Sequence, residues 1–119
     1  MKKKYKNLTV IEPDEKIDTY ALMEACDKVL STYSTIGCEA TYWGKVSIIA
    51  GVAPYDELDC VYQAKSFEDL FRLIDDKDLA PKLKENSLPY GYRNQVHGEV
   101  YKFFKENSLN DGEFLGNKL

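Results

Sequence analysis

Histidine and cysteine are scarce in this 119-residue sequence, which has one histidine and three cysteines. The cysteines are widely spaced, at Cys26, Cys38 and Cys60. An odd number of cysteines without a Cys-x-x-Cys pair argues against a disulfide framework and favours a reducing compartment. One histidine and three scattered thiols also lack the paired local ligands of a zinc site, so the sequence predicts no metal site.

Long apolar runs and nucleotide-binding loops are also missing. No stretch approaches the roughly 18 apolar residues that a membrane span needs, and residues 1–10 lack the apolar segment of a signal peptide. The sequence has no G-x-G-x-x-G or Gly-Lys-Ser/Thr pattern, and residues 75–78 lack the glycine and the glutamate of a calcium loop. We therefore expect a cytoplasmic protein that uses no cofactor and does not bind a membrane.

Negative charge is in excess and is unevenly distributed. The formal net charge is −4, but four lysines lie in residues 1–6 without an acid, so the remaining residues carry −8. An acidic surface repels nucleic-acid phosphates and attracts basic surfaces. We therefore expect no direct nucleic-acid binding, and a larger protein with a basic surface as the partner, such as a nuclease or another nucleic-acid-handling enzyme. The sequence leaves the oligomeric state open.

The composition is typical of a folded globular protein, with 44% hydrophobic, 13% aromatic and 30% charged residues. A chain of this length fits one domain with one hydrophobic core. We therefore predict a single domain over residues 1–119, in which the basic segment 1–6 and the tail 108–119 are mobile.

Short β-branched or alternating runs predict four strands. The second and third of these runs are joined at Gly44 and Lys45, which favours a tight β-hairpin. The fourth run follows a short polar loop and extends the hairpin to an antiparallel meander. The expected strands are 7–12, 38–43, 46–52 and 60–64.

Apolar residues at three- and four-residue spacing predict three helices. Ser66, followed by Asp69, is typical of a helix start. Gly98 falls inside the last helix and predicts a closely packed neighbour. The expected helices are 14–33, one from Ser66 to about residue 78, and 94–107, with one further helical turn at 82–85. The predicted fold is α+β: a three- to four-stranded, mainly antiparallel sheet against about three helices, in the order β-α-β-β-β-α-α.

His97 and Cys38 are the residues from which an enzyme could be built. A catalytic histidine needs a nucleophile or an orienting carboxylate beside it, and Cys38 near a strand end is one candidate. His97 also borders the apolar stripe of the expected last helix, where a half-buried structural histidine is common. Cys26 and Cys60 fall at positions typical of small buried hydrophobes.

Two loops combine charge with aromatic rings, as protein interfaces often do. The first is an acidic loop expected to present a tyrosine at its tip, and the second is a Gly/Pro-rich loop with two tyrosines and an arginine. The predicted partner-binding residues are Tyr55, Asp56, Glu57, Asp59, Tyr90, Tyr92 and Arg93.

The residue usage, rich in Lys, Asn, Tyr and Ile, resembles that of accessory proteins from phages, plasmids and low-GC bacteria, although the resemblance covers no motif. The acidic, tyrosine-bearing surface and the missing catalytic motifs predict a non-catalytic inhibitor that occludes the basic groove of a nucleic-acid-handling partner, in the manner of anti-CRISPR or antirestriction proteins. Two alternatives stay open. One is a small cytosolic enzyme that uses His97 with Cys38 or a carboxylate, and the other is a self-associating regulatory subunit.

Overall fold

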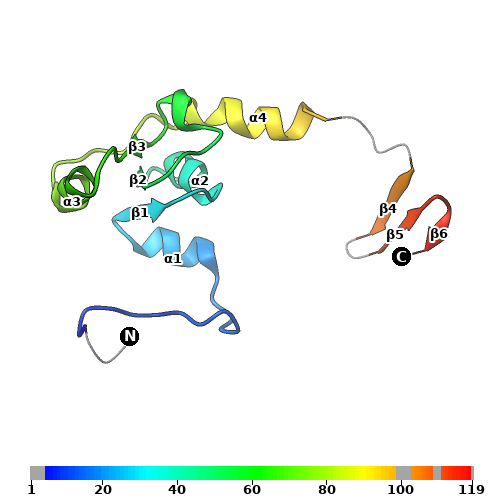
Figure 1. Ribbon diagram of the computed structural model, residues 1–119, viewed down its shortest axis with the longest axis horizontal. Coiled ribbons are helices and arrows are strands. Elements are labelled where there is room, and N and C mark those ends of the chain that lie inside the picture. The colour runs from blue at the N-terminus through cyan, green and yellow to red at the C-terminus, as the bar shows by residue number, and fades with distance from the viewer. Residues whose placement is uncertain (1–4, 99–102, 109–110, 119) are drawn as a thin grey trace.

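The computed structural model describes residues 5–98, 103–108 and 111–118. These residues form an α+β fold with four α-helices, a parallel three-stranded sheet and a separate antiparallel three-stranded sheet (Figure 1). The helices are α1 (Thr19–Ala25), α2 (Ile36–Tyr42), α3 (Phe67–Asp75) and α4 (Leu88–Val96), with 3₁₀ turns η1 (Asp56–Leu58) and η2 (Lys84–Ser87). The strands are β1 (Lys28–Ser31), β2 (Val46–Ile49), β3 (Tyr62–Gln63), β4 (Phe104–Ser108), β5 (Asp111–Phe114) and β6 (Asn117–Lys118).

The parallel sheet has the strand order β1-β2-β3, and α2 makes the crossover from β1 to β2. Alternate residues of β2 enter two different clusters. Ile49 packs with Cys38 of α2, whereas Ile48 packs with Leu73 of α3. The helices α2 and α3 therefore cover opposite faces of the sheet, and β2 is buried at all four positions. Strands covered on both faces are mostly apolar, which accounts for Val46, Ile48 and Ile49, whereas Ser47 is a buried polar residue within the strand.

The predicted antiparallel meander is wrong, because residues 38–43 belong to a helix and its C-cap and not to a strand. Gly37 and Ala40 are small and buried, which lets α2 approach the sheet closely. Gly44, with φ of +70°, ends the helix. Its amide and that of Lys45 donate to the carbonyls of Thr41 and Ala40, as in a Schellman motif. Gly44 and Lys45 thus form a helix C-terminus and not a hairpin turn.

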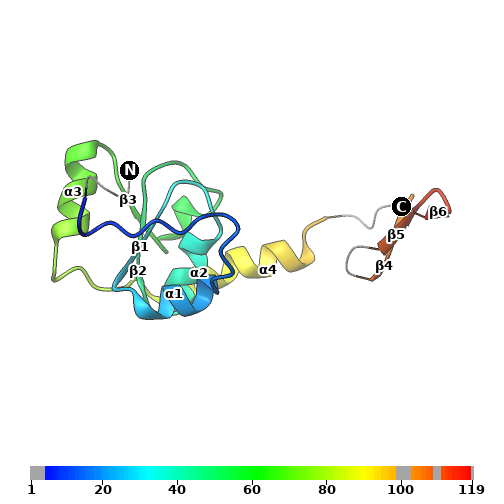
Figure 2. The same ribbon diagram turned by 90° about the horizontal axis from the view of Figure 1, so that it is seen from below.

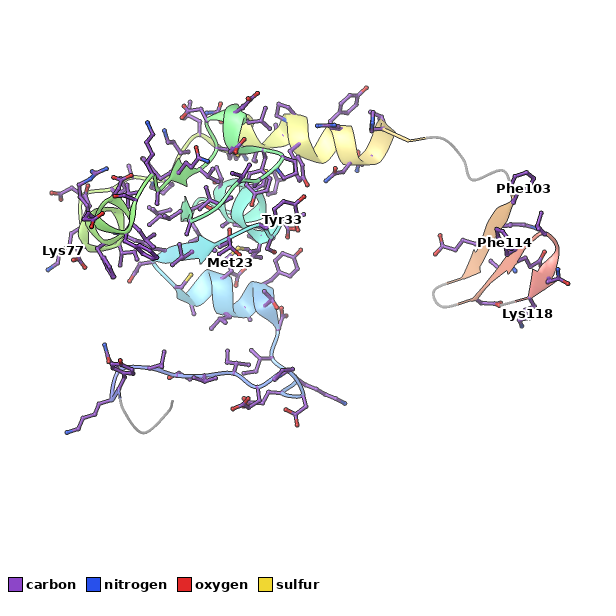
Figure 3. The ribbon with its side chains drawn as sticks, viewed as in Figure 1. Met23, Tyr33, Lys77, Phe103, Phe114 and Lys118 are labelled. Carbon is purple, nitrogen blue, oxygen red and sulfur yellow. The ribbon has the colours of Figure 1, made fainter. Side chains whose placement is uncertain are left out.

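The expected helix 14–33 divides into α1 and strand β1. Asp18 caps α1 by accepting from the amide of Tyr20 at 2.8 Å. The ammonium of Lys45 donates to the carbonyls of Glu24 and Cys26 at the end of α1, which satisfies hydrogen-bond acceptors that have no partner within the helix. Met23 is buried and lies between α1 and β1 (Figure 3). Residues 7–12, expected to be a strand, form none.

The expected helix at Ser66 is confirmed. The Ser66 hydroxyl accepts from the Asp69 amide at 3.1 Å, which is the predicted cap. The other end is held by Lys28 of β1, whose ammonium donates to the carbonyls of Leu73, Ile74 and Asp76. The short strand β3 and the turn η2 also fall within or beside the predicted ranges 60–64 and 82–85.

The predicted last helix, 94–107, is displaced toward the N-terminus. Helix α4 ends at Val96, and its C-cap His97 has an extended backbone. Gly98 has φ of +129° and no atom within 4 Å of an added Cβ, so backbone conformation and not a close neighbour accounts for this glycine. Val100, part of the expected apolar stripe, lies outside the described residues.

Residues 104–108 form the first strand of an antiparallel sheet, and part of the tail forms the other two. The turn between β5 and β6 has positive φ at both Leu115 and Gly116, which suits a tight hairpin. Both views place this sheet beyond the end of α4 (Figures 1 and 2). The expected mobility of 1–6 and 108–119 stays a prediction.

Candidate functional site

The carboxyl ends of the three parallel strands meet at one edge of the sheet. We call residues 32–35, 50–53 and 64–66, which follow β1, β2 and β3, the carboxyl edge. Backbone hydrogen bonds of 2.9 Å join Ala50 to Ser31 and Ala64 to Ile49. Ligands of open α/β sheets bind outside the carboxyl ends of the strands, so this edge is the first place to look for a site.

A hollow of about 200 Å³ lies at the carboxyl edge, next to the start of α3. Exposed Thr32 and Thr35 add hydroxyl groups to the loop after β1. The Gln63 side chain at the end of β3 donates to the Gly51 carbonyl at 3.2 Å and so links β3 to the loop after β2. The hollow is lined by Ala50, Ala64, Lys65, Ser66, Phe67 and Leu70.

Two glycines hold the loops of this edge close together. An added Cβ at Gly37 would lie 2.6 Å from the Tyr55 hydroxyl and 2.8 Å from the Ser31 hydroxyl. An added Cβ at Gly51 would collide with the backbone carbonyl oxygen of Thr32. Both glycines are therefore needed for the close approach of backbone and side chains, which fixes the shape of the edge.

Tyr55, predicted to be the exposed tip of the acidic loop, is wholly buried, so its expected surface position is wrong. Its hydroxyl donates to the carbonyl of Ser34, and its ring packs in the cluster with Cys38 and Ile49. The local sequence does not show whether a loop residue such as Tyr55 is buried, because its burial depends on the turn η1, which places the ring against α2. Burial raises the pKa of Tyr55 above its ordinary value.

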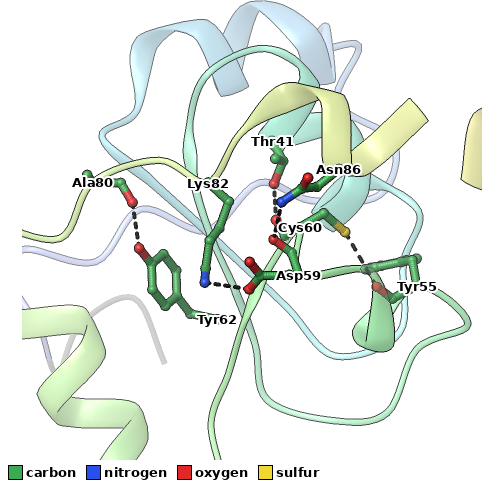
Figure 4. A network of polar contacts seen from close by, with 8 residues as sticks. All are labelled: Thr41, Tyr55, Asp59, Cys60, Tyr62, Ala80, Lys82 and Asn86. Atoms are coloured by element: carbon green, nitrogen blue, oxygen red, sulfur yellow. Dashed lines mark hydrogen bonds and ion pairs between the residues drawn. The ribbon is translucent and has the colours of Figure 1, made fainter. Parts of the chain in front are cut away.

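The remaining acidic residues stay nearer the surface. Asp56 is half-buried, Glu57 is exposed, and exposed Asp59 forms an ion pair with Lys82 at 2.6 Å. The Asp59 carbonyl accepts from the Asn86 side chain at 3.1 Å, which ties this loop to η2 (Figure 4). Lys82 therefore offsets part of the negative charge that the sequence assigned to the loop.

The structure brings the two predicted partner-binding segments together. The ring of Tyr90 contacts that of Tyr55 edge-on, with centroids 5.1 Å apart. Tyr92 and Arg93 are exposed on α4, and the loop expected there is part of the helix. A hollow of about 270 Å³ lies between α4 and Pro54, the residue before the acidic loop, and is lined by Pro54, Tyr90, Arg93, Asn94 and His97.

A larger groove of about 640 Å³ runs between α2 and α4. Sequence reasoning missed it, because residues 38–43 were assigned to a strand. A 3.6-residue spacing that places Thr35, Cys38, Glu39 and Tyr42 on one helix side is the signal that could have revealed it. The α2–α4 groove is lined by Thr35, Cys38, Glu39, Tyr42, Ser87, Leu88, Tyr90, Gly91, Tyr92, Asn94 and Gln95.

His97 and Cys38 line different hollows, which share Tyr90 and Asn94. His97 is exposed at the end of α4, whereas Cys38 is buried and its thiol lies 3.6 Å from the Ser87 carbonyl. Hydrogen bonding to Cys60 and burial raise the pKa of the Cys38 thiol, which keeps it protonated at neutral pH and weakens it as a nucleophile. This geometry does not favour a His97–Cys38 pair.

Comparisons with protein-family models, curated proteins and solved structures each find no match. In the part of the chain that the structure describes, no helix is long and apolar enough to cross a membrane. Within the same residues, no group of three or more His, Cys, Asp or Glu side chains could hold a metal ion.

Proposed function

We propose that this chain binds a polar small molecule at the carboxyl edge of its parallel sheet. The observation that carries the proposal is the register of β1, β2 and β3, which run in the same direction and place three loops side by side. Backbone groups and short side chains at such an edge are available to a ligand, because the strands themselves are covered by helices.

The groups at the edge favour a ligand with hydroxyl groups and little negative charge. Thr32 and Thr35 supply exposed hydroxyls, and Lys65 supplies one cation. Glu68 and Asp69 lie in the first turn of α3 beside the hollow. Arg72 offsets the charge of Asp69 through an ion pair at 2.6 Å, so exposed Glu68 is the group that repels a highly charged anion there. Asp69 accepts from the Lys65 amide at 3.1 Å, so its charge is held at this position.

Titration with glucose, adenosine monophosphate and inorganic phosphate tests the proposal by amide chemical shifts. We expect saturable shifts at Ala50, Gly51 and Lys65 with one of the hydroxyl-bearing compounds, and weaker binding by Thr32→Val and by Lys65→Gln. Lys77→Gln, at an exposed lysine outside the carboxyl edge, is the matched control for Lys65→Gln. The absence of saturable shifts at the edge with all three compounds contradicts the proposal.

A second candidate function is docking on a basic protein, as the sequence predicts. The observation in its favour is the contact of Tyr55 with Tyr90, which places the acidic loop beside exposed Tyr92 and Arg93. Tyrosine and arginine carry much of the energy of protein interfaces, and exposed carboxylates steer a basic partner toward them. Such a protein would inhibit by occlusion and not by chemistry.

Pull-down from a bacterial lysate at low and high salt tests docking. We expect a basic partner to be recovered at low salt and lost at high salt, because screening weakens exposed charge pairs. Glu57→Lys abolishes the recovery by reversing charge in the acidic loop, whereas Asp78→Lys, at an exposed acid outside the loop, leaves it unchanged. Equal recovery with both variants would falsify docking through this loop.

A further inference from the structure

The groove between α2 and α4 combines aromatic rings with one carboxylate. Three of its lining residues are tyrosines, at positions 42, 90 and 92. Glu39 is the one formally charged group among the described residues that line it. A groove lined by π faces and one negative charge is complementary to a cation.

The aromatic surface extends past the groove onto α1 and the end of α2. Trp43 packs edge-on against Tyr42, with centroids 6.5 Å apart, and in a tilted arrangement against Tyr20, with centroids 6.3 Å apart. The Tyr20 hydroxyl donates to one oxygen of Glu39 at 2.6 Å, so the carboxylate is held among the rings. Tyr20, Tyr42 and Trp43 are each about half exposed, and exposed aromatic clusters of this kind mark contact sites.

One cation of the chain itself already approaches this surface. The ammonium of Lys84 lies 5.7 Å from the centroid of the Tyr42 ring. That distance is near the outer limit of a cation–π contact, so the contact is weak and the ring can accept a better-placed cation. Arginine fits this surface better than lysine, because its planar guanidinium stacks on rings while donating to a carboxylate.

We propose that the α2–α4 groove receives an arginine side chain from a basic protein segment, with the guanidinium between Tyr42 and Tyr92 and in contact with Glu39. The inference rests on the docking function and adds the chemistry of its anchor. The acidic loop at 56–59 then attracts the partner, and the groove holds it through a desolvated contact.

The test uses the whole chain and the peptide-like probe N-acetyl-arginine amide, followed by amide chemical shifts. We expect saturable shifts at Gly91 and Asn94 of the groove, and weaker shifts with N-acetyl-lysine amide. Glu39→Gln raises the Kd about tenfold, because the charged hydrogen bond is lost. Asp78→Asn, at an exposed acid outside both the groove and the acidic loop, leaves the Kd unchanged.

A second pair of variants separates ring stacking from general charge attraction. Tyr92→Leu raises the Kd about two- to five-fold. Tyr33→Leu is its matched control, since Tyr33 is 69% exposed against 68% for Tyr92 and does not line the groove. Equal effects of these two variants, or no groove shifts with the arginine probe, overturn the inference.

Failure of the groove and failure of docking give different results. If the lysate partner is captured equally well by wild type, Glu39→Gln and Tyr92→Leu, docking stands and the groove is not its anchor. If the arginine probe binds in the groove but no basic partner is captured at either salt concentration, the groove binds arginine and docking through the acidic loop is wrong. A variant whose far-ultraviolet circular dichroism spectrum differs from that of wild type is excluded from the comparison. If Tyr92→Leu is excluded in this way, the conservative Tyr92→Phe variant replaces it. Tyr92→Phe keeps the ring and must bind the arginine probe like wild type.

Discussion

Tyr55→Ala lowers the free energy of unfolding by about 3–5 kcal/mol, the range for removing a large buried aromatic ring. Tyr55 is wholly buried between α2 and α4, in contact with Tyr90 and within the cluster of Cys38 and Ile49. Small domains have about 5–15 kcal/mol of stability, so this variant is close to unfolded. Urea denaturation followed by the fluorescence of the single tryptophan, Trp43, measures the loss.

Tyr55→Phe is the matched control, because it keeps the ring and removes only the hydrogen bond to the Ser34 carbonyl. We expect a loss of about 0.5–1.5 kcal/mol. Burial raises the pKa of Tyr55 in the folded protein above the ordinary value of 10.0, so the folded state holds the phenol proton more tightly than the unfolded state does. The contribution of protonated Tyr55 to the free energy of unfolding is therefore complete below pH 10.0 and falls as the pH rises above it. Because phenylalanine has no titratable hydroxyl, the free energy of unfolding of Tyr55→Phe lacks this contribution to the decrease above pH 10.0. A Tyr55→Ala variant as stable as wild type means that the ring lies at the surface, as the sequence alone predicts.

Gly51→Ala lowers the free energy of unfolding by about 1–3 kcal/mol, because the new Cβ collides with the Thr32 carbonyl oxygen. The collision is with backbone and not with a flexible side chain, so the loops after β1 and β2 must move apart. The same variant distorts the carboxyl edge. We therefore expect it to weaken ligand binding there as well, which the chemical-shift titration measures.

Gly91→Ala is the control for this change, since no atom lies within 4 Å of an added Cβ at Gly91. Gly91 lies inside α4, where alanine is the better helix former by about 1 kcal/mol. The two Gly→Ala variants should therefore move the urea midpoint in opposite directions. A Gly51→Ala variant that is as stable as wild type shows that the loops at the carboxyl edge are not closely packed.

Helix α2 shows why part of the fold escaped prediction. Its sequence, residues 36–42, has β-branched and aromatic residues and lies next to a glycine that suits a turn, so local preferences favour a strand. Seven residues are too short for a clear apolar period to emerge. Tertiary contacts favour the helix instead, because it buries Cys38 and Thr41 and lets the Thr41 hydroxyl donate to the Cys60 carbonyl across the core.

Some features of the candidate sites could be identified from residue type, whereas others depend on tertiary packing. The acidic loop and the tyrosines of α4 were identifiable by residue type, but their contact depends on the packing of Tyr55 against Tyr90, which are far apart in sequence. The spacing within residues 35–42 could have revealed one wall of the α2–α4 groove. The meeting of α2 with α4 and the carboxyl edge could not be predicted, since each is made of segments far apart in the chain.

The sequence by itself determined the α+β class, the negative net charge, the helix after Ser66 with its cap, and the short strand near residue 62. Each of these depends on composition or on contacts between residues close in the chain. Only the tertiary structure decided the direction of the strands, the burial of Tyr55 and the position of the grooves. These depend on contacts such as those of Lys28 with the end of α3, which join residues more than 40 positions apart and leave no local pattern.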